Sequence, residues 1–140
     1  MIRDKEILKI LQTQAIAAAA LVNLQIKCVG KIFTPPKKGD PWLEVVFIPN
    51  NLTNETWGNE KTYQGLMRIV LHSQVNNEGP YPLMEKMAVI SAQFDKGSLI
   101  THESTSLVLK ITDHPSLDDI IETPPDILIP LTIRYSCFVT

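Results

Sequence analysis

The sequence predicts an α+β fold, in which two main helices pack on a mainly antiparallel or mixed sheet of about five strands. Apolar residues recur at helical spacing in two segments and at every second position in several others. The predicted strands cluster in the order α-β-β-β-α-β-β, whereas a parallel sheet needs strands that alternate with helices. With 140 residues, 44% of them hydrophobic, we expect one domain over residues 1–140 that can bury a core.

The first predicted helix spans residues 3–22. One apolar stripe at steps of three or four residues supports it: Ile7, Leu11, Ala15, Ala18 and Val22. The run Ala17–Ala20 consists of strong helix formers with very small side chains. We therefore expect another backbone, from a sheet or a neighbouring subunit, to approach this helix closely.

Three strands are predicted next, at residues 24–32, 42–48 and 63–75. The first shows the alternation of a half-buried strand. Prolines and a glycine within residues 35–41 separate it from the second, and a polar loop at residues 49–62 precedes the third. Because proline cannot continue a ladder, residues 35–41 are interpreted as a stiff connection.

The second predicted helix spans residues 81–94 and follows the turn "NNEGP". Gly79 can adopt a positive φ in that turn, and Pro80 is preformed for a helix start. Its apolar stripe is Leu83, Met87, Ile90 and Phe94, and Gly97 is a candidate for the cap near its end.

Two strands complete the chain. The first contains Leu107, Leu109 and Ile111, and the second alternates without interruption from Asp126 to Thr140. Pro130 lacks a backbone donor, which favours an edge position or a bulge for this last strand. An edge of this length would invite pairing with another chain unless it is covered.

Charge and composition limit the classes of function. A net charge of -2 provides no broad basic surface for the electrostatic binding of nucleic acid. No secretion signal is recognised, and the apolar run at residues 15–22 is far shorter than the roughly 20 residues of a membrane span. We expect a soluble protein made in the cytosol, without a membrane partner. Cys28 and Cys137 are interpreted as reduced core residues.

The densest polar cluster lies at residues 112–126, where four side chains could hold a divalent metal: Asp113, His114, Asp118 and Asp119. Their spacing matches no calcium loop. The simpler interpretation is a solvated loop in which Ser116 caps a short helical turn. A small metal-dependent enzyme remains an alternative.

Other catalytic signals do not form a pattern. His72 and His102 lie on or near predicted strands and are interpreted as surface or satisfied histidines. The sequence contains no GxSxG nucleophile motif and no glycine-rich phosphate loop. We expect no catalytic residues and no cofactor.

The two tryptophans are the sharper candidates for interaction. Trp42 begins a strand, which favours a place in the core or as a lid over it. Trp57 lies in a polar loop, where core burial is harder to arrange. Tryptophan is enriched at interface anchors, so Trp57 is either an inter-subunit contact or a local lid.

Four segments in order carry a family resemblance: "TPPKKGDPWLEVVFIPN", the stretch leading to "TYQGLMRIVLH", "NNEGP" and "LMEKMAVISAQFDKGSLI". The matching positions are Pro36, Gly39, Pro41, Trp42, Pro49, Asn50, Tyr63, Gly65, Gly79, Phe94 and Gly97. Together they resemble the tail terminator proteins of long-tailed bacteriophages. The similarity is strongest over residues 34–100.

The resemblance implies a structural virion protein without catalytic residues or a cofactor. Such proteins form a ring, usually hexameric, at the head-proximal end of the tail tube, where they end tube polymerisation and provide the surface for joining to the neck. The implied partners are further copies, the tail tube protein and a neck or head-completion protein, and genomic DNA passes through the lumen. Another neck or head-completion ring protein is the close alternative.

One stretch is the best candidate for a protein contact. Residues 34–50 hold a stiff, partly basic connection next to a strand. The predicted interface residues are Pro36, Lys37, Lys38, Trp42 and Trp57, and we expect them to meet a neighbouring subunit or the tail tube.

Overall fold

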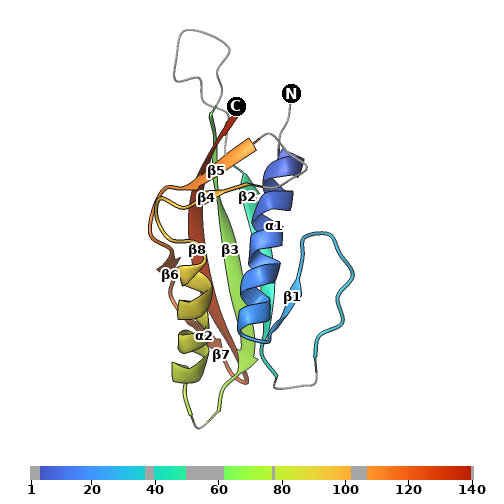
Figure 1. Ribbon diagram of the computed structural model, residues 1–140. Helices are drawn as coiled ribbons and strands as arrows, with labels where there is room; N and C mark the ends of the chain where they lie inside the picture. Colours follow the sequence, from blue (N-terminus) through green and yellow to red (C-terminus); the bar gives the residue numbers. More distant parts are fainter. Residues whose placement is uncertain (1–3, 37–39, 50–61, 77, 102–106, 140) are drawn as a thin grey trace.

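The computed structural model describes residues 4–36, 40–49, 62–76, 78–101 and 107–139. Over these residues the fold is α+β: two helices lie on one face of a large curled mixed sheet (Figure 1). The elements are α1 (Asp4–Leu21), β1 (Gln25–Lys27), β2 (Trp42–Pro49), β3 (Thr62–Gln74), α2 (Tyr81–Ala92), β4 (Leu99–Ile100), β5 (Leu107–Ile111), β6 (Ser116–Leu117), β7 (Ile121–Thr123) and β8 (Asp126–Val139).

The sheet is organised around β8. The strand order is β1-β2-β3-β8-β5-β4, and β6 and β7 also pair with β8. β3 pairs antiparallel with β8 from Thr62 opposite Phe138 to Gln74 opposite Asp126. Among the described strands, only the β1–β2 pair is parallel. The expectation of a mixed, mainly antiparallel sheet is therefore confirmed.

Both predicted helices are confirmed, and their apolar stripes form the core against the sheet. Every residue of the α1 stripe is at most 8% exposed. Ala18 and Ala19 are buried, whereas Ala17 and Ala20 are exposed. The small buried alanines allow α1 to lie close to the layer beneath it. The amide of Gln14 donates to the carbonyl of Gln93 (3.1 Å), which ties α1 to the end of α2.

The second helix begins and ends close to the predicted positions. Gly79 has a φ of +74°, as its place in the turn requires, and Pro80 is the N-cap residue. The helix ends earlier than expected, with Gln93 as the C-cap. Gly97 instead has a φ of +87° in the following turn and donates its N–H to the carbonyl of Ile111 (2.8 Å). The turn thus leads the chain directly into β4.

The described residues contain eight strands rather than about five. The additional strands β4, β6 and β7 have only two or three residues each. Segments this short show no readable alternation, because they become strands only by pairing with a longer neighbour. Ser116 accordingly lies in β6, and the prediction of a helical turn capped by this residue is wrong.

The first strand is also shorter than predicted. β1 ends at Lys27, and Ile32, which the alternation placed on the strand, is fully exposed. Cys28 follows β1 and is buried, as is Cys137, and the two cysteines do not form a disulfide. The expectation of buried cysteines is confirmed.

The prediction that β8 could lie at an edge is wrong. One side pairs with β3, and successive stretches of the other side pair with β5, β6 and β7. Pro130 falls between the stretches that pair with β7 and β6, and its carbonyl accepts from the Asp118 N–H (2.9 Å). In an antiparallel strand, the amide nitrogen of a residue points to the same side as its carbonyl oxygen. The nitrogen of Pro130, which has no hydrogen to donate, therefore faces the gap between the β7 and β6 pairings.

Within the described part of the chain, no helix is long and apolar enough to cross a membrane.

Candidate interaction face

The helices cover only one face of the sheet, and we call the opposite face the outer face. Odd-numbered residues of β2, β3, β5 and β8, such as Leu43, Ile69 and Ile129, point into the core. Even-numbered residues point away, because successive strand side chains alternate between faces. Most described side chains of the outer face on β2 and β3 are half-buried, and they mix apolar with charged groups. This face is therefore the natural candidate for contacts.

An aromatic stack stands at one end of the outer face. Trp42 on β2 lies opposite His72 on β3, and their rings are parallel with centroids 4.0 Å apart. Phe33 packs against the tryptophan at 5.1 Å with an interplanar angle of 33°. Contacts of this kind fix the chain that enters β2 onto the sheet.

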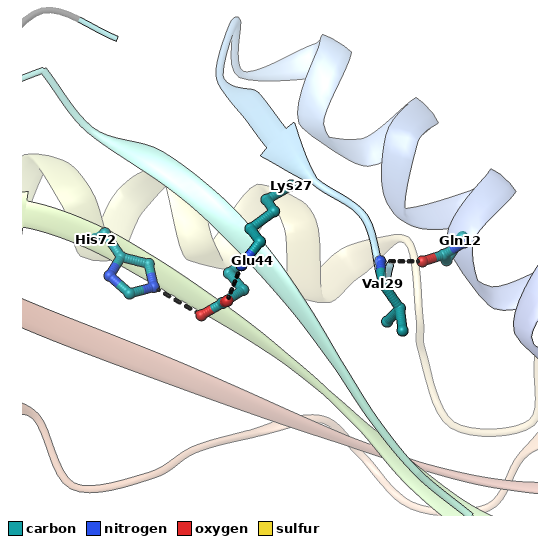
Figure 2. A network of polar contacts seen from close by, with 5 residues as sticks. All are labelled: Gln12, Lys27, Val29, Glu44 and His72. Atoms are coloured by element: carbon teal, nitrogen blue, oxygen red, sulfur yellow. Dashed lines mark hydrogen bonds and ion pairs between the residues drawn. The ribbon is translucent and has the colours of Figure 1, made fainter. Parts of the chain in front are cut away.

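Glu44 connects three strands beside this stack (Figure 2). Lys27 Nζ donates to Glu44 Oε2 (3.2 Å), and His72 Nε2 lies 3.1 Å from Glu44 Oε1. Burial alone would raise the pKa of Glu44, but the contacts with His72 and Lys27 lower it overall. Glu44 is thus held in its ionised form, and it orients the histidine that stacks on Trp42.

A second polar cluster lies farther along the outer face. The hydroxyl of Thr132, which is only 4% exposed, donates to Asp118 Oδ2. Arg68 Nε lies 3.4 Å from both the Thr132 hydroxyl and Asp118 Oδ2. This cluster joins β3 and β8 to the segment after β6, so it supports the shape of the face.

A groove of about 450 Å³ opens next to the aromatic stack. We call it the acidic groove, defined by Pro36, Asp40, Trp42, His72 and Asp126. Its walls come from the proline-rich connection, from the ends of β2 and β3, and from the start of β8. It therefore combines a stiff rim, an aromatic wall and two carboxylates.

The structure brings two of the predicted interface residues to this groove. Pro36 and Trp42 both line it. Trp42 is not part of the inner core and packs instead on the outer face against His72. Lys37, Lys38 and Trp57 lie outside the described residues.

The four candidate metal ligands are not brought together as a site. Asp113, His114 and Asp119 are exposed, while Asp118 is bonded to Thr132 and Arg68. Among the described residues, no group of three or more histidine, cysteine, aspartate or glutamate side chains could hold a metal ion. The geometry of this segment favours a role in supporting the sheet.

Sequence reasoning missed Glu44 and Asp126 as parts of the face. It interpreted His72 as a surface or satisfied histidine, and its contact with Glu44 confirms the second form. The available signal was parity: Trp42, Glu44 and His72 all occupy even positions of predicted strands. Parity alone does not say which strands are neighbours or which of their residues lie opposite each other. These depend on the strand order and the register.

A sheet with helices on one face and a grooved, half-polar face on the other is a scaffold suited to protein contacts. A family model described as phage tail terminator protein matches residues 6–135, nearly the whole chain. The chain therefore belongs to the phage tail terminator protein family, as the sequence resemblance indicated. Membership gives it a structural role in the phage tail and a place in the virion, in a family that is structural rather than enzymatic.

The comparison with solved structures supports the fold. One solved chain, whose name states no function, superposes with a TM-score of 0.75 at 16% sequence identity. The match covers 100% of this chain and 97% of the other. At this identity the likeness concerns the fold alone. A search of curated proteins finds no significant match.

Proposed function

We propose that this protein caps the head-proximal end of the phage tail tube as a hexameric ring, ends tube polymerisation and provides the surface for joining to the neck. The observation that carries the proposal is the family match over residues 6–135. The partners are further copies of the chain, the tail tube protein and a neck or head-completion protein. Assembly takes place in the host cytoplasm.

The charge of the chain is compatible with a ring around DNA. Tight, salt-dependent binding to the phosphates of DNA requires several lysine or arginine contacts. A net charge of -2 gives no such excess. DNA can then pass through the lumen without sequence-specific binding.

The outer face supplies a contact surface of suitable construction. Pro36 and Trp42 form a stiff wall of the acidic groove, and the stack on His72 fixes that wall to the sheet. A surface that is rigid before binding loses little conformational entropy on association. We assign Pro36 and Trp42, with Lys37, Lys38 and Trp57 from the adjoining segments, to contacts with a neighbouring subunit or the tube.

The test is tube length. Purified protein is added at rising concentration to polymerising tube protein of the same phage, and lengths are measured by electron microscopy. We expect shorter tubes, each bearing one ring at one end. Tubes of unaltered length would refute the proposal. Binding to the isolated neck alone would favour the neck or head-completion alternative.

Particle mass provides a second measurement. Six subunits of 15.7 kDa form a particle of about 94 kDa. The mass of the ring is measured on complexes released from capped tubes, because ring closure can depend on the tube. A released ring with a different number of subunits would refute the hexamer while leaving the capping activity intact.

A further inference from the structure

Ile32, on the connection between β1 and β2, is fully exposed, so its side chain packs against none of the described residues. Val29 on the same connection is exposed as well. A single exposed apolar side chain is common on protein surfaces. Ile32 differs because the chain on both of its sides is fixed to the rest of the subunit.

Contacts hold the chain before and after Ile32. The N–H of Val29 donates to Gln12 Oε1 on α1 (2.8 Å; Figure 2). Phe33, the residue after Ile32, packs against Trp42 on β2. An anchored segment therefore presents this isoleucine to solvent, and we call the side chain of Ile32 the exposed knob.

A hollow of about 300 Å³ lies where the end of β3, the start of α2 and β7 come together, and we call it the apolar hollow. The apolar residues that line it are Val75, Pro80, Leu83, Ile120 and Ile127. Leu83 and Ile127 belong to the hydrophobic core, so the hollow reaches down to the core. A closed apolar cavity of about 150 Å³ is enough to bind benzene. The apolar hollow therefore has room for the side chain of an isoleucine.

The exposed knob and the apolar hollow belong to opposite sides of the subunit. In Figure 1 the connection between β1 and β2 projects on the right, whereas the start of α2 and β7 lie at the lower left. The knob therefore does not reach the hollow of its own subunit. A second copy brings an identical knob, and a contact between two different surfaces can repeat from copy to copy.

The charges that adjoin the two surfaces support this pairing. Lys31 is exposed directly before Ile32. Glu122 lines the hollow, and Glu78 is exposed in the turn before α2. Lys86, the one cation of α2, is half-buried and offsets only part of this negative charge. Lys31 can therefore pair with Glu122 when the knob enters the hollow, which favours one orientation of the contact.

We propose that Ile32 of one copy inserts into the apolar hollow of a second copy. The contact joins a projecting side chain to a hollow of sufficient size and removes apolar groups of both copies from water. Each subunit presents both a knob and a hollow, so successive copies can close into a ring. The inference rests on the proposed function, because it identifies the surfaces through which the ring assembles.

Substitution of the knob tests the contact. Self-association of the full-length wild type, Ile32→Ser and Ile16→Ser is followed by analytical ultracentrifugation up to millimolar concentration. Ile16 is an exposed isoleucine of α1 that belongs to neither surface, so its substitution is the matched control. We expect Ile32→Ser to self-associate at least about tenfold more weakly than the wild type, because no apolar side chain then fills the hollow. The control should associate like the wild type. Thermal unfolding of Ile32→Ser should match the wild type, since Ile32 has no packing contact to lose.

Disulfide trapping identifies the surface that receives the knob. Equal amounts of Ile32→Cys and Val75→Cys protein are mixed and mildly oxidised, and linked peptides are identified by mass spectrometry. Val75 is an exposed lining residue of the hollow. We expect a link between positions 32 and 75 of two different copies, in clear excess over the link in a mixture of Ile16→Cys and Val75→Cys. Cys28 and Cys137 are buried, and the wild type treated in the same way measures their background.

Three results would overturn the inference: a wild type that stays monomeric at millimolar concentration, an Ile32→Ser variant that associates like the wild type, or no excess of the 32–75 link over the 16–75 link. The tube-length assay is run on the same proteins and separates the two proposals. Association that depends on Ile32, with the 32–75 link but without any shortening of tubes, refutes the terminator function and keeps the contact. Tubes shortened by the wild type, with an Ile32→Ser variant that associates and shortens them equally, refute the contact and keep the function.

Discussion

Tyr135 occupies the space above Gly65, its direct partner in the β3–β8 pair. A Cβ placed on this glycine would lie 2.6 Å from the Tyr135 hydroxyl oxygen and 2.9 Å from the carbonyl oxygen of Ile48. The tyrosine is 2% exposed, and its ring stacks on Phe47 with centroids 6.2 Å apart. The glycine is thus required by close packing at the middle of the sheet.

Gly65→Ala is expected to lower the free energy of unfolding by about 1–3 kcal/mol, because the new methyl group overpacks a filled site. In a Tyr135→Phe background the same change should cost less, since one of the close oxygens is gone. It should still cost something, because the Ile48 carbonyl oxygen and the ring carbon Cζ, each 2.9 Å from the new methyl group, are still present. Urea denaturation of the four proteins of this cycle measures the coupling. Equal costs in both backgrounds would contradict the packing argument.

Asp118→Ala is expected to destabilise the protein by about 1–3 kcal/mol, because it leaves the buried Thr132 hydroxyl without its acceptor. Asp119→Ala is the matched control: its carboxylate is exposed, and the change should stay within about 0.5 kcal/mol. Thermal unfolding with and without a chelator measures both variants. Equal effects of the two substitutions would contradict the hydrogen-bond argument. Stabilisation of the wild type by added divalent metal would restore the metal-site interpretation.

Trp42→Ala is expected to cost roughly 1–3 kcal/mol of stability, because the stacked contact with His72 and the contact with Phe33 are both lost. Trp42→Phe keeps an aromatic ring and should cost less. A double-mutant cycle between Trp42→Ala and His72→Ala should give a coupling energy of about 0.5–1.5 kcal/mol. Additive effects would show that the two rings do not stabilise each other.

Glu44→Gln is expected to lower stability by about 1 kcal/mol or less near neutral pH, because it removes the charged partner of Lys27 and His72. Folding lowers the pKa of Glu44 from its ordinary value of 4.5, so the contribution is present above that pH. It is lost as the pH falls through the lower folded value, where the carboxyl becomes protonated.

The pH dependence gives this prediction its test. Unfolding free energies of the wild type and of Glu44→Gln are compared by urea denaturation between about pH 6 and pH 3. The difference between the two proteins should shrink toward the acidic end. Glu85→Gln, on an exposed helix position, is the control and should show no such trend. A gap that is constant or that widens in acid would contradict the proposed network.

The sequence by itself determined the two helices, the long strands and the side of each element that is buried. The stripes from Ile7 to Val22 and from Leu83 to Phe94 are regular, and the odd-numbered residues of β8 from Ile127 to Cys137 are all hydrophobic and buried. Periodicity is a local property, so it can be recognised without knowing any neighbour. The ordered turns and helices were also sufficient to indicate the family.

The tertiary structure decided which strands are neighbours. The set of side chains that meet on the outer face depends on this strand order. Strand order places β8 in the middle of the sheet rather than at its edge, and it creates β4, β6 and β7 by pairing. Register places His72 opposite Trp42 and Tyr135 opposite Gly65. These pairs join residues 30 and 70 positions apart in the chain, and such contacts depend on the packing of the whole sheet.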